Sequence, residues 1–404
     1  MKLFLAILPL MAPLFAAEHK VIFPAGAKPI GPYSPGIMVG DFLYVSGQGA
    51  RDANNNFAAS PEERVRQCLN NVKAIVSAAG LTMEHIVYTQ VYLHKDTSYE
   101  VMNKVWDEFF PKNPPGRATL GLHRMPTETT VEISAVAVRE LSMKKPIKPD
   151  WYPKKMNIAP AVEAGGRIYL SGFLGRDINT GKVPDDPAQQ VTLALTRVQQ
   201  ILEAAGLDFR HLVFVNPYLT KNIPRRVMDD LYAKRFEFGN TPARATIEVA
   251  FLPLGANIEF TGVAVRDLSQ RKAIRPKNMP PSPTASPCVF GGDTLYCSAK
   301  AGFIPGPNGG IYADTVEGQT RMTMRSLLDG LEEAGLNFSN VVASNVYLDN
   351  MDDFAKMNGV YGKFFPAAAP PTRTTVSPVA PVERKTSPTG HYPKLEEISV
   401  VAVK

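Results

Sequence analysis

The sequence has few of the residues from which metal sites and phosphate sites are built. Its six histidines are scattered and form no HxxxH or HExxH pattern, and none of its three cysteines has metal-ligand spacing. It contains no P-loop and no GxGxxG stretch. We therefore expect no metal site and no phosphate-binding loop.

Cysteine is too scarce for a fold that rests on a disulfide framework. Cys288 and Cys297 are the only near pair and could form one disulfide in an exported protein. Cys68 stands beside Leu69 on a predicted helix, so we expect it to be a buried thiol.

Runs of like charge are also missing. The net charge is +6 and the isoelectric point about 9.0, yet Lys and Arg are spread along the chain. A scattered basic excess is typical of a solvated surface, so a nucleic-acid partner is permitted but not expected. Beyond the N-terminus, no apolar segment approaches the length of a transmembrane helix.

The N-terminal residues have the layout of a secretory signal peptide. Lys2 provides the positive region, Leu3–Phe15 is apolar, and the small residues Ala16 and Ala17 precede Glu18. We expect a signal peptide over 1–17 and an exported protein, periplasmic or secreted, that keeps no membrane segment after cleavage. The alternative is an uncleaved membrane anchor.

The rest of the chain repeats one unit three times. DFLYVSGQGA, GRIYLSGFLG and DTLYCSAKAG place Ser46, Ser171 and Ser298 at steps of 125 and 127 residues, and later landmarks keep the same order. Each copy has the size of a small domain rather than of a solenoid repeat. We expect modules at 18–142, 156–268 and 284–404, with Pro- and Lys-rich linkers at 143–155 and 269–283.

Each copy has the pattern of an α+β module. In the first, 42–47 is apolar and β-rich, and Ser60-Pro61-Glu62-Glu63 is a capping box that opens a helix ending at Gly80. The strand IVYTQVYL, a second amphipathic helix over Tyr99–Phe110 and the strand VEISAVAV follow. Both helices should cover one face of the sheet, so we expect the other face to pack on the sister copies.

An arginine and a glutamate recur in every copy at the points where chemistry is most plausible. Each arginine follows a proline and precedes a threonine by two residues, and a strand glutamate follows. The arginines are Arg117, Arg244 and Arg373; the threonines are Thr119, Thr246 and Thr375; the glutamates are Glu132, Glu259 and Glu397. The Arg-to-Glu spacing is 15 residues in the first two copies and 24 in the third, which carries an insertion.

These two residue types suit a small carboxylate ligand. A guanidinium binds a carboxylate in bidentate fashion, and a glutamate in an apolar strand is costly unless it is paired or used. Beside a bound imine, such a glutamate could activate a water molecule. The alternative is a salt bridge between the Arg and the Glu of one copy.

The motifs resemble the reactive-intermediate deaminase (Rid) family, also called the L-PSP endoribonuclease family. The resemblance is carried by IGPYSP at 30–35, LYVSGQ at 43–48, AAGL with its following strand, MNKVWDEFF, and the Arg segment with VEISAVAV. It covers nearly all of 20–404, three times over. It implies three chorismate-mutase-like modules, and family members are usually homotrimers with active sites between subunits. We therefore expect an intramolecular pseudo-trimer.

The resemblance also implies an activity, namely hydrolysis of 2-imino or 2-enamino acids to 2-oxo acids and ammonia without a cofactor. It assigns the substrate carboxylate to Arg117, Arg244 and Arg373, and the hydrolytic water to Glu132, Glu259 and Glu397. The implied pocket-lining residues are Tyr33, Ser46, Gly47, Ser171, Gly172, Thr119, Thr246, Thr375 and Asn103.

The copies depart from the family pattern unequally. Ile158 and Ala285 stand where the first copy has Tyr33, and Ala299 replaces the glycine after Ser298. Asn103 recurs as Asn358 but becomes Asp229 in the second copy, and many relatives carry a cysteine at the threonine position. At most one cleft can therefore hold the complete set with Tyr33, and the sequence does not say which arginine completes it.

Three functions follow from these residues. The first is an exported imine and enamine hydrolase, and the second is a carboxylate-binding pseudo-trimer without turnover. The third is a ribonuclease, which neither a histidine pair nor a basic stripe supports. The recurring Tyr92, Tyr218 and Tyr347 are expected in the core rather than as base-stacking platforms.

Overall fold

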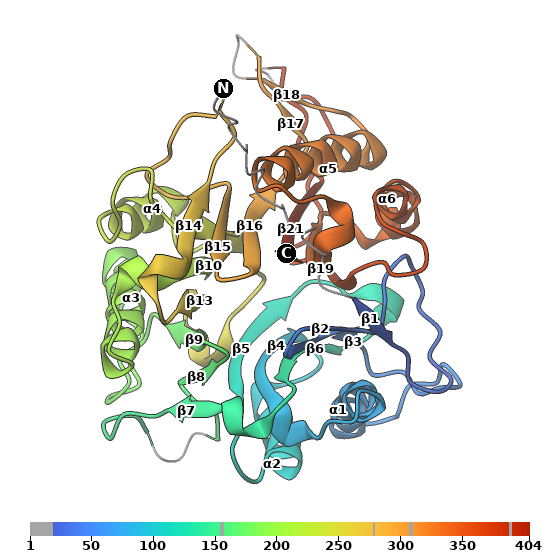
Figure 1. Ribbon diagram of the computed structural model, residues 1–404, viewed down its shortest axis with the longest axis vertical. Helices are drawn as coiled ribbons and strands as arrows, with labels where there is room; N and C mark the ends of the chain where they lie inside the picture. Colours follow the sequence, from blue (N-terminus) through green and yellow to red (C-terminus); the bar gives the residue numbers. More distant parts are fainter. Residues whose placement is uncertain (1–18, 154–156, 278, 307–309, 388–389) are drawn as a thin grey trace, which may run out of the picture.

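The computed structural model describes residues 19–153, 157–277, 279–306, 310–387 and 390–404. The predicted signal peptide, 1–17, lies outside the described residues. Figure 1 shows three groups of strands and helices, one per sequence repeat, arranged around a common centre.

The first module is an antiparallel sheet completed by one parallel strand. Its strand order is β1-β2-β3-β6-β4-β5, with β5 parallel to β4. The elements are β1 Lys20–Ile22, β2 Gly36–Val39, β3 Phe42–Gln48, α1 Pro61–Ala78, β4 Ile86–His94, α2 Tyr99–Phe109, β5 Gly116–Leu122 and β6 Val131–Val138.

The second module repeats this order with a broken parallel strand. Its sheet runs β7-β8-β9-β13-β10-β11, and β12 also pairs with β10. The elements are β7 Lys145–Ile147, β8 Ala161–Ala164, β9 Arg167–Leu174, α3 Pro187–Ala204, β10 Leu212–Leu219, α4 Arg225–Ala233, β11 Ala243–Arg244, β12 Ile247–Glu248 and β13 Ile258–Val265.

The third module adds a small hairpin, β17–β18, to the same plan. Its main sheet runs β14-β15-β16-β21-β19-β20. The elements are β14 Arg271–Ile274, β15 Cys288–Gly291, β16 Thr294–Lys300, β17 Phe303–Ile304, β18 Ile311–Tyr312, α5 Val316–Glu333, β19 Val341–Leu348, α6 Phe354–Tyr361, β20 Thr372–Val376 and β21 Glu396–Val403.

Short 3-10 turns join many of these elements. They span Met83–His85, Pro126–Glu128, Leu141–Met143, Phe209–His211, Pro253–Gly255, Leu268–Gln270, Phe338–Asn340, Met351–Asp353 and Gly362–Phe364.

The predicted helices and strands of a module are confirmed. Ser60 caps α1 with the reciprocal capping box, and Gly80, with φ of +79°, follows the helix end at Ala79. Three strands of the first module were not predicted, namely β1, β2 and β5, of which the last is formed by the Arg segment itself. The Pro-Pro-Gly that precedes Arg117 has the composition of a turn, but the parallel ladder to β4 holds this segment extended.

The two segments expected to be linkers each contain a short strand, β7 or β14, that pairs with the first hairpin of the following module. Pro146 is tolerated in β7 because this strand lies at the edge of its sheet. Both strands occupy the place of β1 in the first module.

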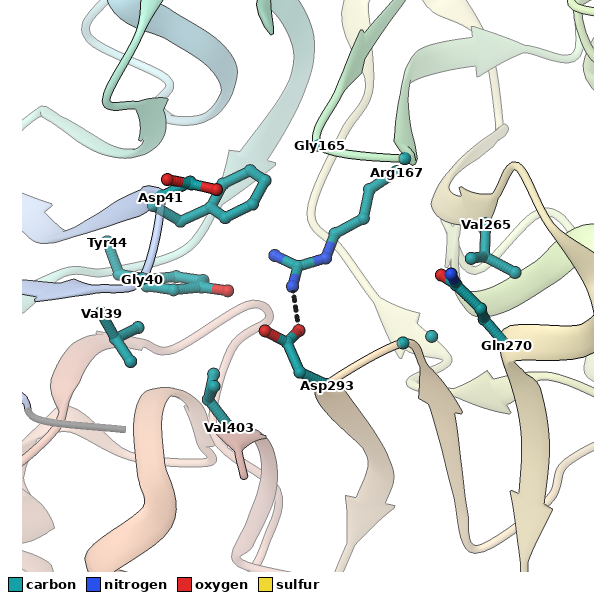
Figure 2. A pocket seen from close by; sticks show the side chains of 14 residues that line it. Val39, Gly40, Asp41, Tyr44, Gly165, Arg167, Val265, Gln270, Asp293 and Val403 are labelled. Atoms are coloured by element: carbon teal, nitrogen blue, oxygen red, sulfur yellow. Dashed lines mark hydrogen bonds and ion pairs between the residues drawn. The ribbon is translucent and has the colours of Figure 1, made fainter. Parts of the chain in front are cut away.

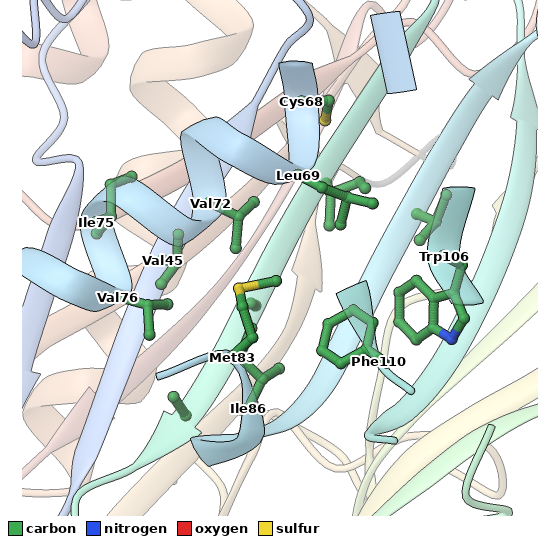
Figure 3. Packing of buried hydrophobic residues seen from close by; sticks show 14 of the residues in the cluster. Val45, Cys68, Leu69, Val72, Ile75, Val76, Met83, Ile86, Trp106 and Phe110 are labelled. Carbon is green, nitrogen blue, oxygen red and sulfur yellow. The ribbon is translucent and has the colours of Figure 1, made fainter. Parts of the chain in front are cut away.

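Each module has its own hydrophobic core between the helices and one sheet face. In the first, Leu69, Val72 and Val76 of α1 pack with Trp106 and Phe110, as Figure 3 shows. Corresponding clusters fill the other two modules. Cys68 is buried and unpaired as expected, and Cys288 forms a disulfide with Cys297, its cross-strand neighbour.

The opposite sheet faces pack on one another. Three further clusters each combine residues of different modules; one of them contains Tyr92, Tyr218 and Tyr347, which are buried in the core as predicted. The expectation that the free sheet face is covered by sister copies is therefore met within one chain.

Candidate active site

The strand layout puts each glutamate at one fixed place. Glu132, Glu259 and Glu397 lie opposite Tyr92, Tyr218 and Tyr347 on the neighbouring strand of their own sheets. Glu397 is therefore the positional counterpart of the other two, although the insertion lengthens the sequence before it. Each arginine lies on the parallel edge strand: Arg117 on β5, Arg244 on β11 and Arg373 on β20.

Each arginine faces the next module rather than its own glutamate. The backbone N–H groups of Arg117, Arg244 and Arg373 donate to the hydroxyls of Ser171, Ser298 and Ser46 at 2.8, 2.8 and 2.9 Å. In the described part of the chain, no ion pair joins one of these arginines to the glutamate of its own copy. The alternative of an intra-copy salt bridge is therefore wrong.

The three serines act as connectors between modules. Besides accepting from the arginine N–H, each hydroxyl donates to a carbonyl of its own module at 2.6 Å: Ser46 to Ser34, Ser171 to Ala159 and Ser298 to Ser286. The O–H of each serine is thus used within its own module, while its oxygen accepts the hydrogen bond that holds the arginine strand of the neighbouring module in place.

The cleft between the third and first modules contains Arg373, Glu132 and Tyr33. These residues line one cavity of about 670 Å³ together with Gly47 and Thr375. Arg373 is buried, and neither of its terminal nitrogens, Nη1 and Nη2, has a hydrogen-bond partner. A buried guanidinium with both terminal nitrogens free is a ready site for a carboxylate.

Aromatic rings surround the Arg373 guanidinium in place of anions. The rings of Tyr33, Tyr361 and Phe354 lie 5.2, 4.9 and 5.4 Å from its carbon. Cation–π contacts hold the guanidinium in position without neutralising its charge. Asn358 lies close by, since a side chain added at Gly31 would touch both Arg373 and Asn358.

Glu132 lies against the backbone of Gly47. A Cβ at Gly47 would come within 2.0 Å of Glu132 Oε1, so only glycine leaves room for this carboxyl. Burial raises the pKa of Glu132 to about 8, although the Arg373 guanidinium acts to lower it. The carboxyl is thus able to exchange a proton near neutral pH.

In the cleft between the first and second modules, the arginine already has hydrogen-bond partners. Arg117 Nη2 donates to Asn103 Oδ1 at 2.5 Å and to the Tyr99 hydroxyl at 3.3 Å, while Nε and Nη1 have no partner. The Thr119 N–H donates to Glu259 Oε1 at 3.3 Å, and burial raises the pKa of Glu259 to about 8. Ile158 supplies no aromatic ring here.

The cleft between the second and third modules has its charges already paired. Arg244 Nη1 lies 2.6 Å from Asp229 Oδ1, and Glu397 Oε2 lies 2.6 Å from Lys394 Nζ. Asp229 holds the place of Asn103 and Asn358, and Lys394 belongs to the insertion. Both groups that would meet a carboxylate substrate are therefore occupied by side chains of the protein.

One set of site residues went unrecognised in the sequence. Trp106, Tyr232 and Tyr361 contact Arg117, Arg244 and Arg373 with ring distances of 4.6, 5.1 and 4.9 Å. All three stand at the fifth position of the MNKVW, MDDLY and MNGVY landmarks. The repeat alignment therefore carried the signal, because an aromatic residue recurs at one position in all three copies.

The described residues contain no group of three or more His, Cys, Asp or Glu arranged to hold a metal ion. Among their helices, none combines the length and the apolar character needed to cross a membrane.

Comparison with known proteins agrees with the modules. The sequence model of a family described as Endoribonuclease L-PSP matches 25–139, 155–266 and 279–386, which is more than half of the chain. The chain belongs to the Rid/L-PSP family.

Relatives of this family member match one module at a time. A RutC family protein of Saccharolobus solfataricus is 38% identical over 121 residues, 29% of this chain and 96% of its own. A protein of Dermatophagoides farinae named 2-iminobutanoate/2-iminopropanoate deaminase is 34% identical over 119 residues, 29% of this chain and 93% of its own.

One solved structure resembles a larger part of the chain. A chorismatase crystal structure aligns with a TM-score of 0.51, covering 79% of this chain and 93% of its own at 14% identity. At this identity the likeness concerns the fold alone, and it extends across more than one module.

Proposed function

We propose that the cleft between the third and first modules hydrolyses a small 2-imino or 2-enamino acid to a 2-oxo acid and ammonia. The observation that carries the proposal is the buried Arg373 guanidinium, whose two unpaired terminal nitrogens share a cavity with Glu132. The name of the Dermatophagoides relative, an iminobutanoate and iminopropanoate deaminase, supports the same substrate class.

Arg373 binds the substrate carboxylate through Nη1 and Nη2. The guanidinium plane is fixed by the rings of Tyr33 and Tyr361 and by the N–H of its own backbone on Ser46. A preorganised fork loses little freedom when it binds, so the carboxylate and the attached imine carbon are held in one orientation.

Glu132 moves the protons of the reaction. In its protonated form it gives a proton to the imine nitrogen while water oxygen bonds to the imine carbon, and it takes back the proton that the water loses. The resulting carbinolamine then breaks its C–N bond: the proton of the hydroxyl passes to the nitrogen, which leaves as ammonia, and the C–O bond becomes the carbonyl of the 2-oxo acid. A pKa of about 8 makes both forms of the carboxyl accessible at neutral pH.

The arginine trio provides the test. The rate of 2-oxo acid formation from freshly generated 2-iminopropanoate is measured for wild type, Arg373→Ala, Arg117→Ala and Arg244→Ala. We expect Arg373→Ala to lower kcat/KM by roughly 10²-fold or more, because a buried charge-assisted pair with the substrate is lost. Arg244→Ala should leave the rate within about twofold, since Arg244 is already paired with Asp229.

Two outcomes contradict the proposal. The first is equal loss in all three variants, which would mean that assembly rather than one cleft is affected. The second is a wild-type protein that binds 2-oxo acids without accelerating imine hydrolysis. That second result would identify a carboxylate-binding protein, which the loss of the tyrosine in two copies and the threonines at 119, 246 and 375 favour.

We also propose that the single chain stands in for a trimer and that it is exported. Support for the first comes from the packing of all three sheets within one chain. The layout of residues 1–17 supports export, as does the Cys288–Cys297 disulfide, a bond typical of oxidising compartments. N-terminal sequencing of the protein recovered outside the cytoplasm tests export: a mature chain starting at or just after Ala17 is expected, whereas an intact Met1 retained with the cells would overturn it.

A further inference from the structure

Three equivalent strand positions meet where the modules converge, and each carries a different residue. Phe42, Arg167 and Thr294 occupy the same register position, opposite the last valine of the neighbouring strand. The Arg167 guanidinium lies 4.2 Å from the Phe42 ring centre, and its Nη2 donates to Thr294 Oγ1 at 2.5 Å. Arg167 thus joins the first and third modules from the second.

We call Phe42, Arg167 and Thr294 together the axial ring. A cavity of about 350 Å³ beside it is lined by residues of all three modules, among them Phe42 and Arg167. Figure 2 shows the Arg167 guanidinium reaching into it, with the Tyr44 hydroxyl and the Asp293 carboxylate turned toward it. Arg167 is only 6% exposed, and its Nη2 lies 2.5 Å from Asp293 Oδ1. The Asp293 side chain is 61% exposed, so water screens its negative charge. Asp293 therefore neutralises the positive charge of Arg167 only in part.

Next to Arg167 lies a group of buried polar atoms that can donate hydrogen bonds, which we call the axial donor cluster. It consists of Arg167 Nη1 and the hydroxyls of Tyr44, Tyr169 and Tyr296. None of these four atoms has a partner at full hydrogen-bond geometry among the described residues, although the Tyr169 hydroxyl lies near Arg167 and Tyr296, and the Tyr44 hydroxyl lies near Thr294. The three tyrosines occupy equivalent strand positions, each two residues after its module's member of the axial ring. They also line a second, inner cavity of about 130 Å³ between the sheets.

Buried polar groups are almost always hydrogen-bonded. A phenol hydroxyl can also accept a hydrogen bond from a neighbour, but a guanidinium N–H can only donate, so Arg167 Nη1 calls for an acceptor. We propose that the axial donor cluster binds one small monovalent inorganic anion of halide size. A guanidinium N–H and three phenol O–H groups all donate, and burial keeps the tyrosines protonated by raising their pKa values. A multivalent anion is disfavoured, because one guanidinium does not offset the desolvation of two or three charges.

The tandem chain makes such a site possible. In a symmetrical trimer, the three positions of the axial ring would carry the same residue. Three guanidinium groups meeting at one point would repel each other. Here the positions are occupied by one cation, one aromatic ring and one hydroxyl. The ring therefore supplies a single positive charge to the cluster, which matches one monovalent anion.

Crystals grown with sodium bromide test the site directly, because bromide gives an anomalous scattering signal. We expect one bromide peak within hydrogen-bond distance of Arg167 Nη1 and at least two of the tyrosyl oxygens. The peak should be absent in crystals of Arg167→Met. A peak that appears only at the protein surface, or water alone in the cluster, would overturn the proposal.

Thermal unfolding in chloride and in gluconate, at equal ionic strength, gives a second measurement. The Tm of wild type should rise with the logarithm of the chloride concentration but not with gluconate, which is too large for the cluster. Tyr44→Phe and Tyr296→Phe each remove one donor without changing the packing and should weaken chloride binding about tenfold. Arg266→Met, which loses an exposed arginine paired with Glu163, is the matched control and should keep the wild-type chloride response. Equal Tm values in chloride and gluconate for wild type would show that no halide binds.

Discussion

The backbone N–H of Arg373 donates to the hydroxyl of Ser46 at 2.9 Å, so the last module of the chain closes onto the first. This contact aligns β20 with β3 and thereby puts Arg373 into the same cavity as Glu132 and Tyr33. The most complete cleft is thus the one whose two halves lie farthest apart in the sequence. A truncated chain that lacks either end would lose it.

Gly47 and Gly172 offer a matched pair of substitutions. A Cβ would come within 2.0 Å of Glu132 Oε1 at Gly47 and within 1.6 Å of Glu259 Oε1 at Gly172. Both Gly47→Ala and Gly172→Ala should lower the free energy of unfolding by about 1–3 kcal/mol, because each forces a buried carboxyl to move. Only Gly47→Ala should also lower kcat for imine hydrolysis, by tenfold or more.

The comparison of these two variants separates stability from catalysis. Urea unfolding measures the first and 2-oxo acid formation measures the second. If Gly172→Ala lost as much activity as Gly47→Ala, the assignment of turnover to the Glu132 cleft would be wrong.

The sequence predicted the module but not the pairing of its residues. Helix α1 could be read from its capping box and apolar spacing, and Arg117 and Glu132 stood out because they recur in every copy. Which arginine meets which glutamate depends on the direction in which the modules follow one another around the axis, and no local pattern encodes that direction. Asp229 was visible as a departure, yet its ion pair with Arg244 follows only from the packing of α4 against β11.

Size in solution tests the pseudo-trimer. If the three modules replace three subunits, light scattering should give a mass close to one chain, at most 44.1 kDa before any processing. The expectation follows because the inner sheet faces are already buried against each other, as clusters such as the one around Tyr92 and Tyr218 show. A mass near three chains at micromolar concentration would contradict the proposal.

Freeing Arg244 from its ion pair should change ligand binding in the cleft between the second and third modules. Asp229→Asn places there the residue found at positions 103 and 358 and leaves Arg244 without its anionic partner. We expect the free energy of unfolding to fall by roughly 1–3 kcal/mol without ligand, because a buried guanidinium loses its counter-ion. A short 2-oxo acid such as pyruvate should then raise the Tm of the variant more than that of wild type.

The control is Asp230→Asn, which changes the neighbouring exposed carboxylate. An equal rise of Tm with pyruvate in wild type and both variants would argue against a latent carboxylate site at Arg244.

Three buried carboxyls should make stability depend on pH. Burial raises the pKa of Glu132, Glu259 and Glu396 to about 8 from a usual value near 4.5. Between these two values the folded chain binds more protons than the unfolded chain, so the free energy of unfolding falls as pH rises from about 5 to about 8. Each group contributes a slope of at most about 1.4 kcal/mol per pH unit.

Glu396 is the cleanest of the three carboxyls to test, because it accepts a hydrogen bond from Thr323 in the core of the third module, away from the Arg373 cavity. Glu396→Gln keeps the shape of the side chain and should flatten the pH dependence measured by urea unfolding at pH 5, 6, 7 and 8. As a control, replacing the exposed Glu383 by Gln should not change the slope of the free energy of unfolding against pH. An unchanged slope in Glu396→Gln would mean that Glu396 is already ionised in the folded protein at neutral pH.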